Sequence, residues 1–479
     1  MSPRRISPAS VTRLLGPWRG ERVGPAYSQL ADCLRLLILD GRLPLDLVLP
    51  GERELAGALE VSRTTVTAAL ARLRDDGFLE RRQGAGARTR LPAGPGQRGG
   101  GVIASPPVDG MLDLASAAPP ASDASHGAYA AALPALPAHL PQTGYGVLGL
   151  PALREAIAQR YTRRGLPTSA EQIMVTNGAQ HGFALMIRLL AGPGDRVVID
   201  HPTYPHAIDA IQRASCRAVP VGLPDTGWDV DGVAAAMRQS GPRLAYFIAD
   251  FHNPTGRWMS LETRAAIAAA AERTRTTLIL DETLVDLWLD APIQPYGFDE
   301  PGEGVVRLGS TGKSFWGGLR LGWIRADVQT IQALGPRRAS IDLGTPLLEQ
   351  LAAVHLIENE EPALIERRRM LRMRREHLIG RMGEALPDWR ISSPPGGLSL
   401  WAELPMAVSS QLAATSERFG LRLAAGPRFG VDGAFERFLR VPYTLAPEQL
   451  DQAVERLERA YSRLRPASAP TRAAMGAVV

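Results

Sequence analysis

The spacing of apolar positions in the first ninety residues predicts three helices. Tyr27–Asp40 carries its apolar residues on one helical stripe, and Gly41 follows as a stop signal. A short helix is expected over Glu52–Leu59. After a sharp break, a third helix is expected over Arg63–Asp75, with Ser62 as its N-cap. The residues expected to face the core are Leu30, Leu34, Leu37, Ile38, Leu55, Leu59, Val66, Leu70 and Leu73.

A glycine-tipped hairpin is predicted after these helices, with Phe78–Arg82 and Ala87–Thr89 as strands and Gly84–Gly86 as the turn. The whole pattern is that of a winged helix-turn-helix, which places the start of its second helix in a major groove. The guanidinium and hydroxyl groups at that start suit guanine and phosphate. A helical module for protein contacts is the alternative. The residues at the helix start are Ser62, Arg63, Thr64 and Thr65, and the wing adds Arg82 and Gly86.

From about residue 111 onward, short apolar runs rich in β-branched residues alternate with longer helical patterns. This alternation predicts a mostly parallel sheet with helices on both faces. Ligands of such sheets bind at the carboxyl ends of the strands. The expected strands lie in "QIMVTNG", "RVVID", "RLAYFIAD", "TTLILDET" and "GVVRLGS".

Polar residues follow three of these predicted strands. Gly178-Ala179-Gln180 opens a helix predicted over 181–190, and free amides at a helix start bind phosphate. Ser310 and Arg320 can donate to the same phosphate. Asp281, at a buried strand end, needs a cationic partner. Two further side chains complete the set, since Asn253 offers an amide donor and Tyr204 a flat aromatic face.

Composition adds one decisive residue, because Lys313 is the single lysine among 54 basic residues. A phosphate, a protonated ring nitrogen, a ring to stack and an aldehyde that needs an amine together describe pyridoxal 5'-phosphate. A guanidinium cannot replace a primary amine in forming a Schiff base. The sequence therefore predicts a pyridoxal phosphate site in which Lys313 is the reactive amine.

The charge is uneven along the chain. Residues 1–90 hold 15 Arg and 10 Asp or Glu, which accounts for the whole net charge of +5 and favours a polyanionic partner for this part. Cys33 and Cys216 lie far apart, which suits a reducing cytoplasm and excludes a disulfide framework or a cysteine-based zinc site. No apolar run approaches the roughly 20 residues of a membrane span, so we expect a cytoplasmic protein without a metal site.

The first ninety residues resemble the DNA-binding domain of the GntR family. The motifs are Pro-x-x-Arg-x-Leu-Ala from Pro50, Val-Ser-Arg-x-Thr-Val from Val61, Gly-Phe-Leu from Gly77 and Gly-x-Gly from Gly84. The resemblance implies contacts with double-stranded DNA. It assigns them to Arg53, Ser62, Arg63, Thr65 and Gly86.

Residues from about 140 to 460 resemble the fold-type I, aspartate-aminotransferase-like enzymes through "VTNGAQHG", "HPTYP", "FHNPTG", "LILDET", "GSTGKSFWGGLRLGW" and "ERFLRVPYTL". The resemblance implies that Lys313 forms the Schiff base with pyridoxal phosphate. It further implies that Asp281 binds the pyridinium, that Asn253 contacts the ring oxygen and that Tyr204 stacks on the ring face. The phosphate is expected to be held by Ala179, Gln180, Ser310 and Arg320. The resemblance also implies that Tyr145 reaches the partner subunit's phosphate and that Arg440 clamps a ligand carboxylate.

The sequence departs from that family pattern in two motifs. Thr283 and Leu284 stand where a tyrosine usually contacts the ring oxygen, and Gly312 replaces a common second serine. A missing donor at the ring oxygen weakens aldimine chemistry more than cofactor binding. Whether amino-group transfer turns over is therefore left open.

The two parts together resemble the MocR family of bacterial transcription regulators. The expected fold is multidomain: an N-terminal winged helix-turn-helix (1–90), a linker (91–110), an α/β fold-type I transferase domain (111–465) with a smaller C-terminal α+β lobe (about 345–465), and a disordered tail (466–479). The resemblance implies a head-to-tail homodimer and an amine or amino-acid effector that exchanges with the Lys313 aldimine to change operator binding. The alternatives are an active aminotransferase with a DNA-binding appendage, and a large domain that has lost the cofactor and only dimerises.

Overall fold

The computed structural model describes residues 5–464 except 17, 20–24, 40–41, 45–46, 83–85, 91–109 and 297–303. The predicted linker at 91–110, apart from Gly110, and the predicted tail at 466–479 lie outside the described residues, as do the tip of the wing and the side chain of Arg82.

The N-terminal part has the predicted winged helix-turn-helix. Its helices are α2 (Ala26–Leu39), α3 (Glu52–Ala58) and α4 (Arg63–Asp75), and its hairpin pairs β1 (Leu79–Arg82) with β2 (Gly86–Thr89). The hydroxyl of Ser62 caps α4 by accepting from the Thr65 amide at 3.1 Å. All nine apolar residues predicted to face the core are buried in one cluster.

An additional helix, α1 (Pro8–Leu15), was not predicted. Ser7 caps it, and Pro8 stands at its first position, where proline costs no hydrogen bond. Val11 is fully buried, and the Thr12 hydroxyl donates to the Ala58 carbonyl at 3.2 Å. The helix thus extends the core of this domain and ties it to α3.

The large domain is built on a seven-stranded sheet of order β4-β10-β9-β8-β7-β5-β6. All five predicted strands are present, and all strands except β10 run parallel. β10 is antiparallel to both of its neighbours, and it and β6 were not among the predicted strands. The strands are β4 (Ile173–Thr176), β5 (Arg196–His201), β6 (Arg217–Gly222), β7 (Leu244–Ile248), β8 (Thr277–Asp281), β9 (Val305–Ser310) and β10 (Gly322–Arg325).

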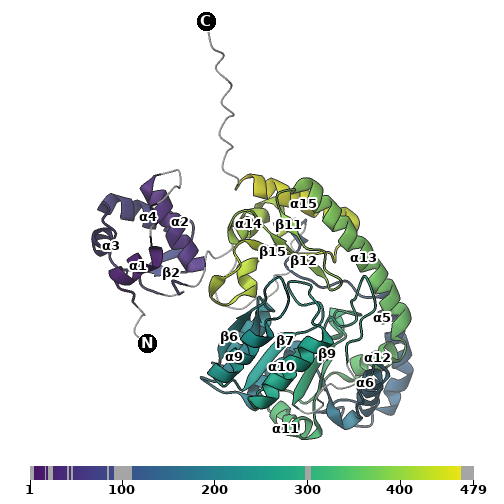
Figure 1. Cartoon of the computed structure of the whole chain (residues 1–479). Coiled ribbons are helices and arrows are strands. Elements are labelled where there is room, and N and C mark those ends of the chain that lie inside the picture. The colour runs from purple at the N-terminus through teal and green to yellow at the C-terminus, as the bar shows by residue number, and fades with distance from the viewer. Residues whose placement is uncertain are drawn as a thin grey trace.

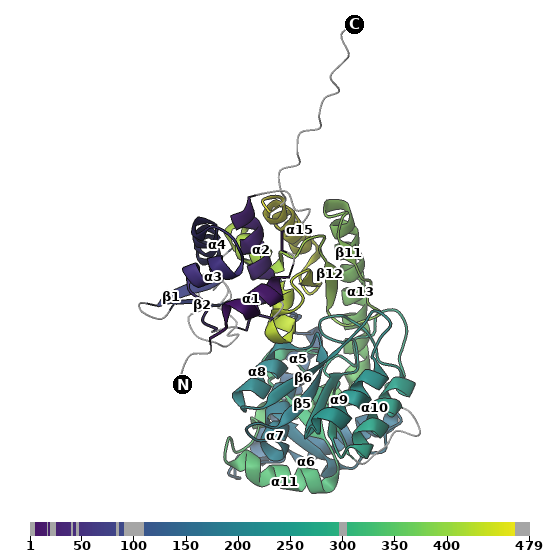
Figure 2. The ribbon, with the colours of Figure 1, turned by 60° about the vertical axis from the view of Figure 1, so that its left-hand side comes forward.

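Helices cover both faces of this sheet, as Figures 1 and 2 together show. One face packs against α7, α8 and α11, the other against α9 and α10, and α5, α6 and α12 cover the edge that carries β4 and β10. Their bounds are α5 (Asp123–Ala132), α6 (Pro151–Arg163), α7 (Ala179–Leu190), α8 (Pro205–Arg213), α9 (Val230–Ser240), α10 (Leu261–Arg273), α11 (Val328–Ala339) and α12 (Leu347–Glu358), with 3₁₀ turns η1 (Leu133–Ala138), η2 (Ala170–Gln172) and η3 (Gly317–Leu319).

The long helix α13 (Glu360–Ala385) leads from the sheet domain into a smaller α+β lobe. This lobe has a four-stranded antiparallel sheet of order β11-β12-β15-β14, packed against α13 and α15. The chain just after the linker joins this lobe, because β3 (Leu112–Asp113) pairs with β13 (Leu421–Arg422). The other elements are β11 (Arg390–Ile391), β12 (Ser399–Glu403), α14 (Ser409–Ser416), η4 (Glu417–Phe419), β13 (Leu421–Arg422), β14 (Ala424–Ala425), η5 (Gly426–Phe429), η6 (Val431–Gly433), β15 (Phe438–Pro442) and α15 (Pro447–Ser462).

The winged helix-turn-helix lies beside the small lobe rather than beside the large sheet, as Figures 1 and 2 both show. Its helix α2 contacts η6 of that lobe. Within the described part of the chain, no helix combines the length and the apolar character needed to cross a membrane.

Candidate functional site

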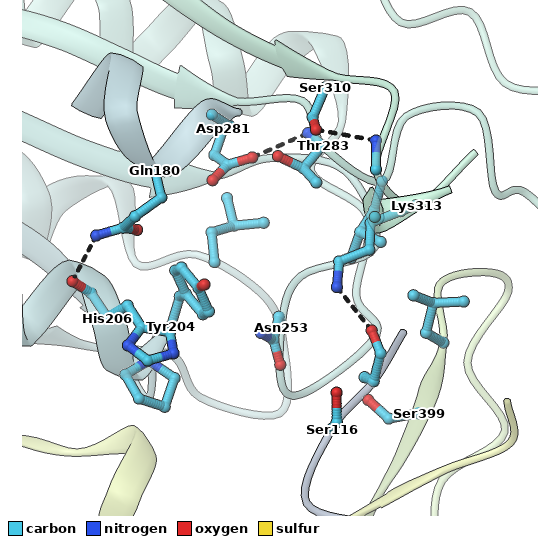
Figure 3. A pocket seen from close by; sticks show the side chains of 18 of the residues that line it. Ser116, Gln180, Tyr204, His206, Asn253, Asp281, Thr283, Ser310, Lys313 and Ser399 are labelled. Carbon is cyan, nitrogen blue, oxygen red and sulfur yellow. Dashed lines mark hydrogen bonds between the residues drawn. The ribbon is translucent and has the colours of Figure 1, made fainter. Parts of the chain in front are cut away.

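A cavity of about 280 Å³ lies between the carboxyl ends of the parallel strands and the small lobe. Nine of the predicted ligand residues line it, although they come from six separate segments of the chain. Figure 3 shows Asp281, Ser310 and Lys313 on the sheet side, with Tyr204 and Asn253 opposite them. The nine are Ala179, Gln180, Tyr204, Asn253, Asp281, Ser310, Lys313, Arg320 and Arg440.

The start of α7 forms an anion cradle at one end of the cavity. Gly178 has a φ of +89°, and a Cβ there would lie 3.5 Å from the Arg320 guanidinium. No side chain caps α7, so the amides of Ala179 and Gln180 are free of protein acceptors within the described residues. Arg320 lies at the same place and donates to the Asn177 carbonyl at 3.3 Å. These donors suit a phosphate group.

Asp281 is held at the end of β8 and is 8% exposed. Its carboxylate accepts from the Tyr246 hydroxyl at 2.6 Å and from the Thr283 amide at 2.9 Å. Among the described residues no cation lies within ion-pair distance of it, and burial raises its pKa above the usual value. A buried carboxylate without a cation favours a ligand that brings one, and a protonated ring nitrogen does so.

Lys313 projects into the cavity, and its Nζ donates to the Ala117 carbonyl at 2.8 Å. Burial lowers the pKa of Lys313 to about 8, and the nearby positive charges of Arg440 and Arg320 act in the same direction while Asp281 opposes them. A lowered pKa gives a larger fraction of the neutral amine near neutral pH, and the neutral amine is the nucleophile.

We expect the rate at which the apoprotein captures pyridoxal phosphate to depend on this titration. Below pH 8, the rate should rise about tenfold per pH unit as the Lys313 amine loses its proton, and it should level off above pH 8. The measurement is the growth of visible absorbance after mixing, at a series of pH values. A rate that still climbs steeply up to pH 10 would contradict a lowered pKa.

Tyr204 and Asn253 flank the centre of the cavity. Tyr204 precedes α8, and burial raises its pKa to about 12, so the phenol stays neutral. The side-chain oxygen of Asn253 accepts from Arg440 at 3.4 Å, which leaves its amide donors for a ligand. Both placements suit the predicted contacts, a stacked ring for the tyrosine and a ring oxygen for the asparagine.

Arg440, on β15, is 6% exposed and reaches the cavity from the small lobe. It donates to the Ala115 carbonyl, and its guanidinium lies 5.0 Å from the centre of the Phe429 ring. Burial lowers its pKa to about 10, and the charge of Arg428 adds to that, so Arg440 stays charged at neutral pH. A buried guanidinium beside a cavity suits a carboxylate.

The structure places Tyr145 apart from this site. Its side chain is 73% exposed, and it does not line the cavity of its own chain. Its expected contact with a partner subunit stays a prediction. Thr283 and Leu284 line the cavity. They are the two residues that stand where the family usually has a tyrosine on the ring oxygen.

Sequence reasoning missed several lining residues, of which Arg428 on η5 carries a charge. No motif marks it, because it lies in a Gly-Pro-rich turn whose direction sequence alone does not give. The only sequence feature that could have pointed to Arg428 is that it lies twelve positions before Arg440. His206, Ser399 and Ser116 were missed in the same way.

The predicted DNA-binding residues gather at the start of α4. Ser62, Arg63 and Thr64 are exposed there, and Arg53 is exposed on α3. The Ser62 hydroxyl lies within hydrogen-bond distance of the Thr64 and Thr65 hydroxyls. Gly86 pairs with the backbone of Arg82 in the hairpin. The four residues at the α4 start form one polar, positively charged surface suited to a groove and its phosphates.

Comparisons with known proteins agree with the family resemblances of the large domain and of the N-terminal domain. Residues 111–457 match the family "Aminotransferase class I and II", and residues 26–88 match "Bacterial regulatory proteins, gntR family". An HTH-type transcriptional regulator of Bacillus subtilis, YisV, is 26% identical over 90% of this chain and 95% of its own. The 2-aminoadipate transaminase of Thermus thermophilus is 28% identical over 61% of this chain and 76% of its own.

Among solved structures, the α-aminoadipate aminotransferase LysN from Thermus thermophilus, in complex with N-(5'-phosphopyridoxyl)-L-leucine, superposes with a TM-score of 0.68. It is 25% identical and covers 74% of this chain and 93% of its own. The large domain therefore has the fold of the pyridoxal-phosphate-dependent aminotransferases. The chain belongs to the aminotransferase class I and II family, and with its gntR-family DNA-binding domain it has the organisation of the MocR transcription regulators.

Proposed function

We propose that this protein is a pyridoxal-phosphate-dependent transcription regulator, in which an amine or amino-acid effector takes the place of the Lys313 amine at the cofactor and thereby changes operator binding. One observation carries the proposal. The single lysine of the chain lies in the cavity with a lowered pKa, among residues that suit each part of the cofactor.

The residues have separate tasks in this proposal. The amides at the start of α7, together with Ser310 and Arg320, bind the phosphate, and Asp281 pairs with the ring nitrogen. When bound, pyridoxal phosphate supplies an aldehyde that condenses reversibly with primary amines. Lys313 holds that aldehyde until an effector amine competes for it, and Arg440 orients the effector by its carboxylate.

The segment after the linker offers a route from the site to the DNA-binding domain. In the structure the Ala117 carbonyl accepts from Lys313, and the Ala115 carbonyl accepts from Arg440. In this proposal Lys313 leaves the Ala117 carbonyl when it binds the cofactor and is free to return when an effector displaces it, whereas Arg440 leaves the Ala115 carbonyl to bind the effector carboxylate. Residues 115–117 therefore change their hydrogen bonds when the effector binds, and this segment leads directly through β3 to the linker. A coupling of about 1–3 kcal/mol is enough for a 5–150-fold change in DNA affinity.

The test is a titration of cofactor-loaded protein with a panel of amines and amino acids. Visible absorbance reports the exchange at Lys313, and binding to the protein's own upstream DNA is measured in the same samples. The proposal requires that at least one compound changes both signals over the same concentration range. If absorbance responds and DNA binding does not, the regulatory role fails.

An active aminotransferase with a DNA-binding domain is the second candidate. It is favoured by the transaminase relatives and by the complete set of Lys313, Asp281 and Arg440 in one cavity. Thr283 and Leu284 weigh against it, because no tyrosine tunes the ring oxygen from these positions. Sustained transfer of an amino group to a keto acid over many turnovers supports this candidate, whereas a single turnover argues for the regulator.

We further propose a head-to-tail homodimer, in which the exposed Tyr145 meets the partner's cofactor site. The exposure of this large aromatic side chain supports the idea. In cofactor-loaded protein, Tyr145→Phe should weaken phosphate binding without changing the monomer fold.

Arg63→Ala should weaken binding to the operator by about 1–3 kcal/mol, because Arg63 is exposed at the start of α4, where a helix-turn-helix meets base edges. Affinity for the operator and for a scrambled duplex should be measured at one salt concentration. A loss confined to the operator identifies a base contact. An equal loss on both duplexes identifies a phosphate contact instead.

A further inference from the structure

Arg428 is a second arginine on the small-lobe side of the cavity, and it has no task in the proposed function. It lies on η5, half-buried, and lines the cavity together with Arg440. Among the described residues, no hydrogen bond or ion pair engages its guanidinium. An arginine that faces a cavity without a protein partner is suited to an anionic ligand.

The backbone around Arg428 is held in place on several sides. The Phe429 carbonyl accepts from the Thr203 amide at 2.8 Å, and the Val431 amide donates to the His201 ring at 3.0 Å. Gly426 packs so closely that a Cβ there would lie 1.9 Å from the Phe435 carbonyl. The turn that carries Arg428 is therefore fixed to β5 and to the small lobe, so the guanidinium is presented to the cavity by a rigid support.

The acidic groups nearest to Arg428 are engaged elsewhere. Asp209 lies 3.8 Å from the His206 ring, and Asp113 accepts from the amides of Ala115 and Ser116 and lies 3.8 Å from Arg422. Neither forms an ion pair with Arg428 within the described residues. Burial lowers the pKa of Arg428, while the charges of Asp209 and Asp113 oppose that shift without cancelling it.

The arginines of the cavity fall into two groups. Arg320 lies with the α7 amides at the phosphate end, whereas Arg428 and Arg440 both reach in from the small lobe. The carboxylate of a simple amino acid satisfies Arg440 and leaves Arg428 without an anion. We infer that the effector is an amino acid with a second acidic group, which Arg428 binds while Arg440 binds the first. This inference rests on the proposed function and names the effector class for the same site.

The experiment compares amino acids that share a carbon skeleton and differ in one acidic group. Cofactor-loaded full-length protein is titrated with glutamate against glutamine, and with 2-aminoadipate against norleucine, while visible absorbance is followed. The acidic member of each pair should reach half-saturation at a concentration about 10–100-fold lower, as expected for one charge-assisted contact. Equal half-saturation within both pairs overturns the inference.

Variants assign the preference to Arg428. In Arg428→Gln the acidic amino acids should bind no better than their neutral partners, whose binding should be unchanged, and Arg428→Lys should restore part of the preference. Arg418→Gln is the matched control, because Arg418 is exposed on the same lobe and does not line the cavity. If Arg428→Gln weakens acidic and neutral amino acids equally, the second acidic group is not bound by Arg428.

A second readout avoids the cofactor chemistry. Glutarate should raise the thermal unfolding midpoint of the loaded protein more than pentanoate does, and this difference should vanish in Arg428→Gln. The two arms separate the two failures. If no amino acid changes the absorbance, the proposed function fails, and the glutarate arm still decides whether Arg428 binds a second acid. If glutarate and pentanoate act alike, the inference fails by itself.

Discussion

Lys313→Ala is expected to abolish the covalent capture of pyridoxal phosphate completely. No other lysine exists in the chain, and the Lys313 amine is the primary amine that lines the described cavity. Borohydride reduction followed by peptide mapping should find the pyridoxyl group on Lys313 in the wild type and no adduct in the variant. Operator binding should survive, because the winged helix-turn-helix has its own core, but it should no longer respond to any amine.

Lys313→Arg is the matched control for charge. It keeps a cation in the cavity but cannot form a Schiff base, so it should resemble Lys313→Ala in the mapping experiment. If the arginine variant retains the effector response of DNA binding, covalent exchange is not the signal. A pyridoxyl adduct on the N-terminal amine alone in the wild type would refute the site itself.

The gathering of the cofactor residues could be predicted because their positions follow from one rule. Each of Ala179, Asp281 and Ser310 follows or ends a strand of the parallel sheet, and such strand ends meet at one edge. The helices of the first ninety residues were predictable for a similar reason, since their apolar spacing and the Ser62 cap are local signals. α1 was missed because its eight residues span little more than two turns, which is shorter than the stretch over which helical periodicity can be judged.

Contacts across long stretches of chain could not be predicted. The Lys313 amine meets the Ala117 carbonyl across 196 positions, and backbone carbonyls carry no sequence signature. Arg428 reaches the cavity only because of the fold of a turn. Buried arginines are the hardest case, because arginine in a sequence is normally an exposed residue. Arg160, Arg307 and Arg367 are nevertheless buried here, each with partners that only the structure shows.

One such buried network lies directly behind the lysine. Asp286 is 4% exposed and accepts from Arg160 at 2.5 Å, from Arg164 at 2.8 Å and from the Ser314 hydroxyl at 2.6 Å. Ser314 is the neighbour of Lys313 in the chain. Glu360 completes the network by accepting from both arginines. The network therefore joins α6, the segment after β8, the start of α13 and the lysine loop.

Asp286→Ala is expected to destabilise the large domain by about 3–5 kcal/mol. The buried guanidinium of Arg160 and the partly buried guanidinium of Arg164 would then share the single carboxylate of Glu360. The measurement is denaturant unfolding followed by tryptophan fluorescence, with the winged helix-turn-helix monitored separately through DNA binding. Glu366→Ala is the control, since Glu366 and its partner Arg369 are both exposed and their pair should contribute nothing measurable. Equal effects of the two variants would contradict a structural role for the buried network.

The pH dependence of this stabilisation has a definite sign. Burial alone would raise the pKa of Asp286, but the charges of Arg160 and Arg164 outweigh it and hold the pKa well below its usual range. A carboxylate with a lowered pKa stabilises the folded state fully above the unfolded value of about 3.9, and the stabilisation is lost as the pH falls below it. The advantage of the wild type over Asp286→Asn should therefore be constant from pH 8 to about pH 5 and should shrink in stronger acid. A difference that grows as the pH falls would show that Asp286 is not the anionic centre of the network.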